Sequence, residues 1–297
     1  KEKNNELQAK VNYTLNLLKK SQRPVLLVGQ GVVSSKATDL VHQFVDKTNI
    51  PVLATWRVLD FMGTEEVGFF GSPGLQAPRF SNIILQHADV LIVLGSRMDN
   101  MITAFNEKHF AFRAKKIIVD IDINEINKLQ MTDVYPILAD IKDFMLELNR
   151  NLKQEIGNYK IWINNCKNLK SNYPVLAEKQ DKTEAVNLYL VTEEISKHAV
   201  TTDTIVISST SRCNTAGHIA FTHKRGQKTI SSMGMGAMGF ALPSAVGAYY
   251  ANGHNRVIVI EGDGSFQLNI QELETIVSNK VDAKLFVFNN LGYAAIT

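Results

Sequence analysis

Two short polar clusters near the end of the chain are the residues best suited to chemistry. The first is Gly262-Asp263-Gly264-Ser265, and the second, some two dozen residues later, is Asn289-Asn290-Leu291-Gly292. Each follows an apolar run that predicts a strand, over 256–261 and 283–288, with a helix expected over 269–278 between them. Open α/β sheets bind ligands at the carboxyl ends of neighbouring parallel strands. The two clusters are therefore predicted to lie at one sheet edge.

The side chains of these clusters have the chemistry of a magnesium–diphosphate site. Asp263 supplies one charged oxygen, Asn290 a neutral amide oxygen and Gly292 a backbone carbonyl. Oxygen ligands with a single carboxylate suit Mg²⁺ that shares its coordination with a phosphate and water. In the turn Gly262-Asp263-Gly264-Ser265, glycine lets the backbone approach a diphosphate, and the amides that open the next helix face it. Gly-Asp-Gly alone is also an ordinary turn, so the pairing of the two clusters carries the prediction.

Size and composition are those of an ordinary globular protein. The chain has 297 residues, 45% hydrophobic and 21% charged, which is enough for about two domains. The net charge of +3 is too small to indicate a nucleic-acid partner. No apolar run approaches the ~18 residues of a membrane span, so no membrane partner is expected. The two cysteines form no CxxC pair, which indicates a cytoplasmic setting, and the histidines are expected at surface or cap positions.

Strand and helix patterns alternate in two sets, which predicts an α/β fold with two doubly wound parallel sheets. In the first set, strands are expected over 24–29, 51–54, 89–94 and 116–120, and helices over 7–20, 37–47, 76–87 and 141–152. In the second set, strands are expected over 204–208, 229–231, 256–260 and 284–288. The predicted domains are residues 1–152 and 187–297, joined by residues 153–186, a helix followed by a linker. The second domain is expected to be truncated, because a parallel sheet normally gains more strands after such a motif.

The paired clusters resemble the cofactor motif of thiamine-diphosphate (ThDP) enzymes, and the whole chain resembles the acetolactate synthase-like branch of that family. Such enzymes have a pyrimidine-binding, a central and a diphosphate-binding domain. Residues 7–150 look like the central domain, and residues 187–297 look like the first part of the diphosphate-binding domain. The pyrimidine-binding domain, which carries the glutamate that contacts the aminopyrimidine ring, has no counterpart here. The resemblance implies ThDP and Mg²⁺ as cofactors, and a homodimer or homotetramer with its active site at the subunit interface.

A second motif, over residues 233–247, supports the resemblance. In relatives a bulky apolar residue here wedges between the two cofactor rings, and the carbonyl two residues earlier accepts a hydrogen bond from the 4′-amino group. These catalytic roles carry over to Met238 and Gly236, and a polarizable thioether suits the wedge. Taken alone, the methionines also fit a core stripe with glycines for close helix packing. Ser211, in the turn 209–211 after a strand, is a further candidate for binding the diphosphate.

The resemblance also suggests a flavin site in the first domain. Acetolactate synthases bind FAD through a Gly-x-Gly turn, a GxxG loop, an Arg–Asp pair and an acidic residue after a strand. The matching residues here are the loop 71–74 and Gly29, Gly31, Gly95, Arg97, Asp99, Asp120 and Asp140. Pro73 and Met101 depart from the family, which usually has histidine and arginine there. The alternative is a structural domain without a cofactor, and the sequence leaves both open.

The implied cofactor limits the reaction class to chemistry on a 2-oxo acid that loses carbon dioxide. Aldehyde-releasing decarboxylases resemble Gly-Tyr-Thr-Ile-Glu after the asparagine pair, and that glutamate is thought to handle protons. Ile296 stands at the glutamate position here. An apolar residue there protects the carbanion from protonation. The resemblance therefore implies decarboxylation of a 2-oxo acid, with pyruvate expected, and acetyl transfer to a carbonyl acceptor.

Two alternatives remain open. The protein could be a 2-oxo acid decarboxylase or a pyruvate oxidase of the same superfamily. It could also be a non-catalytic cofactor-binding or regulatory subunit, because no pyrimidine-binding domain is seen. The intact Asp263, Asn290, Gly236 and Met238 argue against a degenerate site. The mass of the expressed polypeptide discriminates, since ~60 kDa is expected of a three-domain chain.

Overall fold

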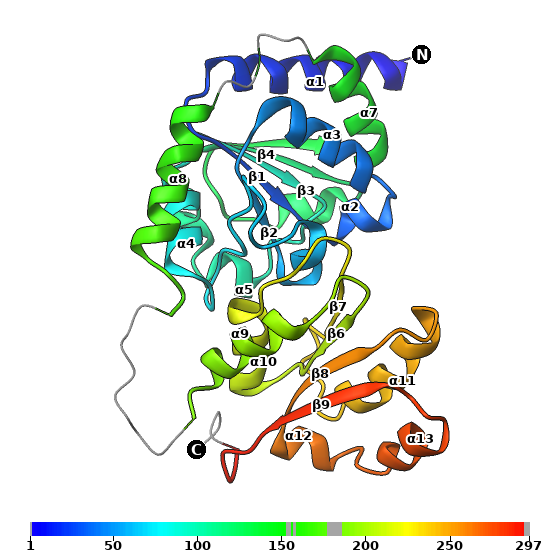
Figure 1. Ribbon diagram of the computed structural model, residues 1–297. Helices are drawn as coiled ribbons and strands as arrows, with labels where there is room; N and C mark the ends of the chain where they lie inside the picture. The colour runs from blue at the N-terminus through cyan, green and yellow to red at the C-terminus, as the bar shows by residue number, and fades with distance from the viewer. Residues whose placement is uncertain (1, 153–155, 157–158, 177–185, 294–297) are drawn as a thin grey trace. The chain divides into compact units, whose positions relative to one another are not determined.

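The computed structural model describes residues 2–152, 156, 159–176 and 186–293. Figure 1 shows the ribbon, which divides into two compact units. Unit 1 comprises Lys1–Val58 and Val67–Pro174, and unit 2 comprises Leu59–Glu66 and Val175–Thr297. Each unit contains one sheet, and all strand pairs in both sheets are parallel. The α/β fold predicted from the sequence is confirmed.

Unit 1 is built on a five-stranded sheet in the order β2-β1-β3-β4-β5. Its strands are β1 (Pro24–Val28), β2 (Val52–Ala54), β3 (Val90–Leu94), β4 (Lys115–Asp120) and β5 (Val134–Leu138). Every residue of β1 and β3 is buried, as expected of central strands covered by helices on both faces. Strand β5 was not expected from the sequence, because Pro136 interrupts its apolar run. Proline is tolerated there because β5 pairs only with β4 and forms an edge.

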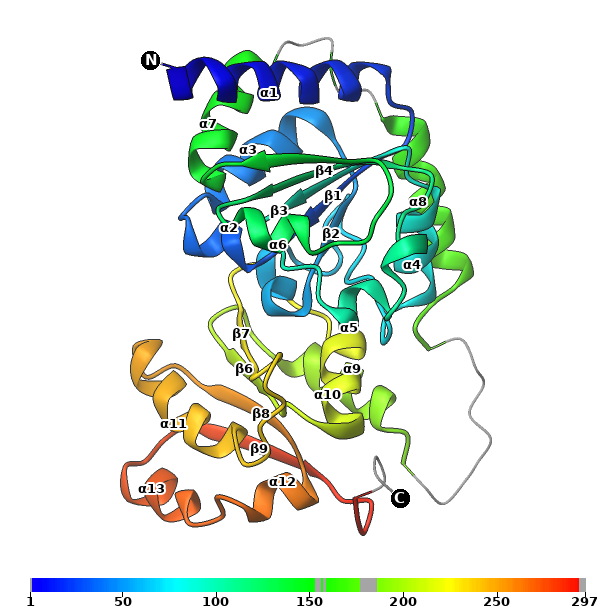
Figure 2. The same cartoon turned by 180° about the vertical axis from the view of Figure 1, so that it is seen from behind.

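Helices cover both faces of this sheet, as the view from behind shows (Figure 2). Helix α7 contacts both α1 and α3, and α4 contacts α8. The α-helices of unit 1 are α1 (Glu2–Lys20), α2 (Gln30–Ser34), α3 (Thr38–Thr48), α4 (Arg79–His87), α5 (Asn100–Thr103), α6 (Ile123–Asn127), α7 (Ile141–Asn151) and α8 (Lys160–Asn172). Two 3₁₀ turns lie at Trp56–Phe61 and Glu107–His109. In α7, apolar residues at positions 141, 144, 145 and 148 form the buried stripe that holds the helix on the unit.

Helix α8 lies in the segment expected to hold a helix and a linker, and it packs as part of unit 1. The Tyr159 hydroxyl donates to the Leu18 carbonyl at 2.9 Å, and Trp162 Nε1 donates to the Pro24 carbonyl at 3.1 Å. Both rings are buried. The compact unit therefore continues to Pro174. The expected domain limits at residues 152 and 187 stay a prediction, and part of that linker lies outside the described residues.

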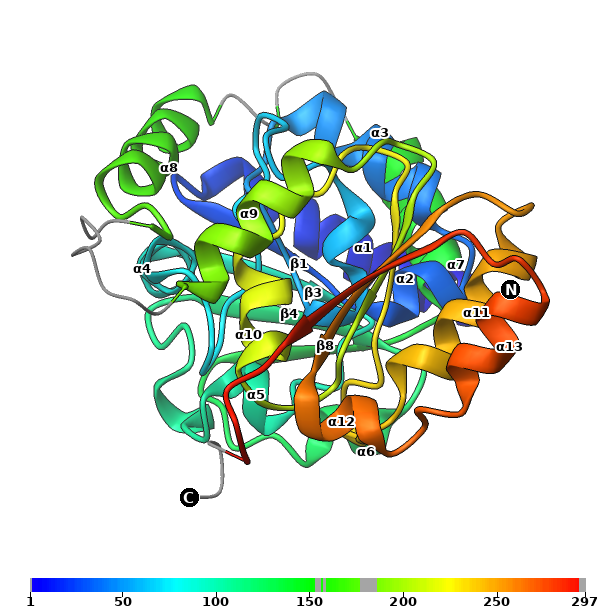
Figure 3. The ribbon, with the colours of Figure 1, turned by 60° about the horizontal axis from the view of Figure 1, so that its bottom comes forward.

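Unit 2 is built on a four-stranded sheet in the order β7-β6-β8-β9. Its strands are β6 (Thr204–Ile207), β7 (Lys228–Ile230), β8 (Val257–Gly262) and β9 (Ala283–Phe288). Its helices are α9 (Leu188–His198), α10 (Ser211–Ala220), α11 (Ala241–Ala251), α12 (Asp263–Gln267) and α13 (Glu272–Ser278). Figure 3 shows α9 and α10 on one face of this sheet and α11 and α13 on the other. The single helix expected over 269–278 is wrong in detail, since the chain forms α12 first and α13 only from Glu272.

Residues 59–66 pack on unit 2, although their neighbours in sequence belong to unit 1. The Asp60 carboxylate accepts a hydrogen bond from the Thr229 amide of edge strand β7 at 3.0 Å. Thr64 and His223 exchange two further bonds, from the Thr64 amide to the His223 carbonyl and from the His223 amide to Thr64 Oγ1. Burial raises the pKa of the Asp60 carboxyl group. This segment therefore covers part of the open edge of the sheet.

The structure contradicts the expectation that the histidines lie at surface or cap positions. His218 and His223 are both buried in unit 2.

The cysteines Cys166 and Cys213 are buried and unbridged. Among the helices that the structure describes, none is both long enough and apolar enough to cross a bilayer.

Replacing Trp162 with phenylalanine is expected to lower the stability of the protein. The substitution leaves the buried Pro24 carbonyl without its donor, which costs about 1–3 kcal/mol. Urea unfolding followed by circular dichroism measures the change. The matched control is Ile161→Ala on the same helix, where the side chain is 81% exposed and little effect is expected. Equal destabilisation by both variants would contradict the packing of α8 described above.

Candidate functional site

The register of β8 and β9 brings the two polar clusters of the sequence together. Gly262 pairs with Phe288, so Asp263 and Asn289 leave the sheet side by side at its carboxyl edge. The chain after β9 then passes over α12. A Cβ atom built on Gly264 would fall 2.5 Å from Cε1 of the Tyr293 ring. The two clusters, far apart in sequence, therefore form one local surface.

This surface offers a mixed set of oxygen donors. Asp263 is half-buried at the start of α12, whereas Asn290 and Gly292 are exposed. Asn290 Oδ1 accepts a bond from the Gly292 amide at 3.3 Å, which shapes the turn. Within the described part of the chain, no group of three or more His, Cys, Asp or Glu side chains is placed to hold a metal ion by itself. The single carboxylate with amide and carbonyl oxygens fits a Mg²⁺ ion that shares its coordination with a phosphate.

The loop over residues 231–239 carries Gly236 and Met238 and lies beside the same edge. Met235 is 89% exposed and Met238 is 36% exposed, so these methionines do not form the core stripe that the sequence also allowed. Gly236 has a φ of +63°, a conformation that favours glycine. The loop contains no helix or strand, and Met238 is accessible to solvent. A residue that contacts a ligand has to be accessible in this way.

Two sets of hydrogen bonds anchor this loop. At its start, the Ser232 amide donates to Ser209 Oγ at 2.8 Å, which ties it to the turn after β6. At its end, the Gly239 amide donates to Ser265 Oγ at 2.8 Å, and Asn269 Nδ2 donates to the Gly239 carbonyl at 2.7 Å. The ends of β6, β7 and β8 are thus connected around one edge. Ser211, predicted to bind a diphosphate, is the first residue of α10 next to this turn.

Polar groups buried beneath the site were not found from the sequence. Glu261, the residue before the Gly-Asp-Gly turn, is 1% exposed, and its Oε2 has no hydrogen-bond partner among the described residues. Asn214 Oδ1 on α10 is also buried and has no hydrogen-bond partner among the described residues. Burial raises the pKa of the nearby Cys213 thiol, and the charge of Glu261 raises it further. The sequence held one signal for Glu261, since it is a charged residue at the end of an otherwise apolar predicted strand.

Two buried histidines lie under the start of the loop. His218 Nδ1 lies 2.8 Å from the Asn214 carbonyl, and its Nε2 lies 3.3 Å from Ser231 Oγ. His223 Nε2 lies 2.7 Å from Thr229 Oγ1. Burial lowers the pKa of His218 to about 4 and that of His223 to about 3. Both rings are therefore neutral in the folded protein at neutral pH.

In unit 1, the glycines predicted for a flavin site converge. The Gly29 amide donates to the Leu94 carbonyl and the Gly31 amide donates to the Gly95 carbonyl, both at 2.9 Å. A Cβ atom on Gly29 would fall 2.3 Å from the Gly95 carbonyl oxygen, so the turn after β1 packs directly against Gly95. Glycine is required there for this close approach.

The predicted carboxylates of unit 1 have local roles in the fold. Asp99 caps α5 by accepting from the amides of Met101 and Ile102, and Asp140 caps α7 by accepting from the Lys142 amide. The Asp120 side chain accepts from the Asp122 amide at 3.0 Å at the end of β4. Arg97 is exposed near Asp99 in the chain. The positions of these carboxylates are therefore explained by local hydrogen bonds, without a ligand. Asp120 lies at the carboxyl edge of the sheet.

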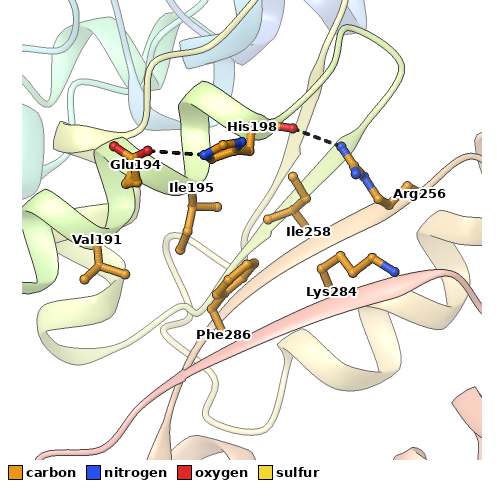
Figure 4. Close-up of a pocket in the computed structure, with 8 residues that line it drawn as sticks. All are labelled: Val191, Glu194, Ile195, His198, Arg256, Ile258, Lys284 and Phe286. Carbon is orange, nitrogen blue, oxygen red and sulfur yellow. Dashed lines mark hydrogen bonds and ion pairs between the residues drawn. The ribbon is translucent and has the colours of Figure 1, made fainter.

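A separate pocket of about 400 Å³ lies elsewhere on unit 2 (Figure 4). Its lining residues are Val191, Glu194, Ile195, His198, Arg256, Ile258, Lys284 and Phe286. Arg256 precedes β8 and Lys284 lies near the start of β9, so the pocket is displaced toward the amino ends of these strands. Its polar rim is already paired, Arg256 with the buried Asp203 at 2.7 Å and His198 with Glu194 at 3.2 Å. It is therefore distinct from the edge that carries Asp263.

A parallel α/β sheet whose carboxyl edge carries Asp263, the Asn289-Asn290 turn and a glycine–methionine loop is the arrangement expected of an enzyme that binds thiamine diphosphate. The chain belongs to the thiamine pyrophosphate enzyme family. Residues 11–148 match the family described as "Thiamine pyrophosphate enzyme, central domain". Residues 210–297 match "Thiamine pyrophosphate enzyme, C-terminal TPP binding domain".

Within this family, the chain is similar to large subunits of acetolactate synthase. It is 31% identical over 284 residues to acetolactate synthase isozyme 2 large subunit of Escherichia coli (strain K12), covering 95% of this chain and 50% of that protein. It is 34% identical over 282 residues to acetolactate synthase 1, chloroplastic, of Oryza sativa subsp. japonica, covering 93% and 42%. It is 30% identical over 279 residues to the Cyanidium caldarium acetolactate synthase large subunit, covering 92% and 46%. The chain thus spans about half the length of the curated relatives it matches.

Acidification is expected to destabilise the protein through the two buried histidines. Below an unfolded-state pKa of 6.5, the unfolded chain binds protons that the folded state excludes until the pH approaches about 4 for His218 and about 3 for His223. This contribution is fully present above pH 6.5 and is lost as the pH falls, at up to about 1.4 kcal/mol per pH unit for each histidine.

Urea unfolding between about pH 7 and about pH 5 measures this dependence. In the His223→Gln variant, the slope of the unfolding free energy against pH is expected to decrease by the contribution of one histidine. This holds whatever the variant's stability at neutral pH. An unchanged slope in this variant would show that the His223 ring is not held neutral in the folded state.

Proposed function

We propose that this protein is a ThDP- and Mg²⁺-dependent enzyme that decarboxylates a 2-oxo acid and transfers the acetyl group to a carbonyl acceptor. Pyruvate is the proposed 2-oxo acid. The observation that supports this most directly is the pairing of Gly262 with Phe288, which sets Asp263 beside the Asn289-Asn290 pair. The similarity to acetolactate synthase large subunits agrees with this reaction class.

The residues at the sheet edge fit the cofactor in this proposal. Asp263, Asn290 and the Gly292 carbonyl would hold Mg²⁺, and the turn over residues 262–265 would bind the diphosphate. Gly236 would accept a hydrogen bond from the aminopyrimidine, and Met238 would contact the rings. When bound, the cofactor supplies the electron sink that a 2-oxo acid needs to lose carbon dioxide. The buried, unpartnered Glu261 Oε2 beneath the turn supports a polar ligand or ordered water there.

Ligation rather than aldehyde release is proposed from the sequence alone. Ile296, at the position of the decarboxylase glutamate, lies outside the described residues. The proposal also includes a homodimer or homotetramer in the cytoplasm. In it, a glutamate from the pyrimidine-binding domain of a neighbouring subunit completes the site. The mass and oligomeric state of the complete protein distinguish this from a non-catalytic cofactor-binding subunit.

We also propose that unit 1 binds FAD at the carboxyl edge of its sheet. The convergence of Gly29, Gly31 and Gly95, with Asp120 at the end of the neighbouring strand β4, supports this. The capping roles of Asp99 and Asp140 support the alternative of a structural domain without a cofactor. Because acetyl transfer involves no net redox change, any flavin would be structural.

Changing Asp263 to asparagine is expected to abolish or severely weaken Mg²⁺-dependent ThDP binding. The change removes the only charged ligand of the proposed metal site. Loss of an outer-shell partner alone typically costs 10–100-fold in metal affinity, so a decrease of at least about 100-fold is expected. Titration of ThDP into the complete protein with Mg²⁺ measures it. Asn290→Ala should weaken binding less.

The matched control is Asp282→Asn. Asp282 is an exposed carboxylate of the same unit that pairs with Lys284 and precedes β9 rather than following it. Its replacement is expected to leave ThDP affinity unchanged. Unchanged affinity in Asp263→Asn would refute the site assignment.

The complete protein is expected to purify with bound FAD, which gives a flavin absorbance. Because the FAD is bound non-covalently, the flavin should stay in solution when the protein is denatured and precipitates. Gly29→Val should abolish this absorbance, because a side chain at this position clashes with the Gly95 carbonyl at the proposed edge. Asp39→Asn on α3 serves as a surface control. A colourless wild-type protein that gains no flavin on incubation with FAD would leave the cofactor-free alternative.

A further inference from the structure

Both backbone groups of Gly239, the residue after Met238, are bonded to the segment that follows Asp263. Its amide donates to Ser265 Oγ at 2.8 Å, and its carbonyl accepts from Asn269 Nδ2 at 2.7 Å. Ser265 is 4% exposed, and Gly239 is buried. Ser265 lies within α12, which begins at Asp263, so this contact joins the end of the loop to the proposed metal site.

The orientation of Asn269 is itself fixed. Gln271 Nε2 donates to Asn269 Oδ1 at 3.1 Å, which occupies the oxygen end of the amide and leaves its nitrogen toward Gly239. Gly239 has a φ of +75°, and a Cβ atom there would fall 2.8 Å from Asn269 Nδ2 and 3.0 Å from Leu268 Cβ. The loop therefore approaches this segment as closely as only glycine permits.

The start of the loop is anchored separately, because the Ser232 amide donates to Ser209 Oγ at 2.8 Å. The Gly236 amide donates to the Ser232 carbonyl at 3.0 Å and the Ala237 amide to Ser232 Oγ at 3.3 Å, both within the loop itself. Met238, near the end of the loop, is only partly exposed. The position of Met238 is thus set by its immediate neighbour Gly239, and the position of Gly239 is set by Ser265 and Asn269.

We propose that Asn269 is a positioning residue that couples the metal–diphosphate turn to the loop carrying Gly236 and Met238. Through Gly239, it holds the Gly236 carbonyl and the Met238 side chain at a fixed place relative to Asp263. Asn269 itself does not touch the cofactor. The inference deepens the proposed function and rests on it for the role of Met238, but the structural coupling itself is independent of any ligand.

The first test measures the loop without cofactor. Amide hydrogen exchange of residues 233–239 is compared in the complete wild-type protein, Asn269→Asp and Asn269→Ala. Aspartate keeps the shape but cannot donate to the Gly239 carbonyl. Loss of the bond is expected to speed exchange in this loop about tenfold, the scale of one or two buried hydrogen bonds.

Asn255→Asp is the matched control. Asn255 Nδ2 also donates to a backbone carbonyl, that of Asn252, but in the turn before β8 at the other end of the sheet. Its replacement should leave exchange in the loop unchanged. Unchanged exchange in both Asn269 variants would overturn the inference, and Asn269→Ala keeps the test valid if the aspartate variant does not fold.

The second test uses ThDP and Mg²⁺. In Asn269→Asp, ThDP affinity is expected to stay within about threefold of wild type, while exchange of the cofactor's C2 proton for deuterium slows about tenfold or more. The turnover number should fall with KM for the 2-oxo acid unchanged. A loss of ThDP affinity as large as in Asp263→Asn would assign Asn269 to cofactor binding and overturn the positioning role. If the wild-type protein binds no ThDP, the proposed function fails, while the cofactor-free exchange experiment still decides the coupling.

Discussion

The parallel pairing of β8 with β9 is the constraint on which the site depends. Six residues of each strand are paired, and Gly262 lies opposite Phe288 at the end of the ladder. A slip by one residue would move Asp263 by about 3.3 Å along the edge relative to Asn290 and turn alternate side chains to the other face. The register is held by β8, of which only the final glycine is not buried. Burial of an apolar strand thus fixes the geometry of a polar site beyond its end.

The polar groups around this edge are organised by hydrogen bonds that cross between elements. Ser209, Ser265 and Asn269 each bond to the backbone of the loop over 231–239, whose glycines give it no intrinsic rigidity. A glycine-rich loop with exposed methionines would otherwise sample many conformations, and ordering it opposes folding through lost entropy. The small side chains that anchor the loop allow it to be open to solvent and still defined in position.

The two sheets share an architecture but use their carboxyl edges differently. In unit 1, Asp99 and Asp140 accept bonds from the amides that open helices, and the amides of Gly29 and Gly31 are bonded within the sheet edge. In unit 2, Asp263 stands at the edge without capping a helix in this way. An aspartate after a strand serves as a helix cap or as a ligand with the same local sequence. The sequence predicted the Asp263 site from the pairing of two clusters and left the flavin site open, and the contacts now show which of these aspartates cap helices.

Local sequence predicted the strands that end in the two clusters, because apolar runs and turn residues act over a few neighbours. The parallel α/β fold and the approach of Asp263 to Asn290 followed only from the rule that neighbouring parallel strands end at one sheet edge. Tertiary structure alone decided the burial of Glu261 and His223, the edge strand β5 with Pro136, and the contacts that anchor the loop. Gly239 and Asn269 lie 30 residues apart, and Asp60 and Thr229 lie 169 apart. Such contacts arise only when the packed sheet brings distant segments within hydrogen-bonding distance, where buried polar groups must find partners. No pattern confined to either segment encodes that distance.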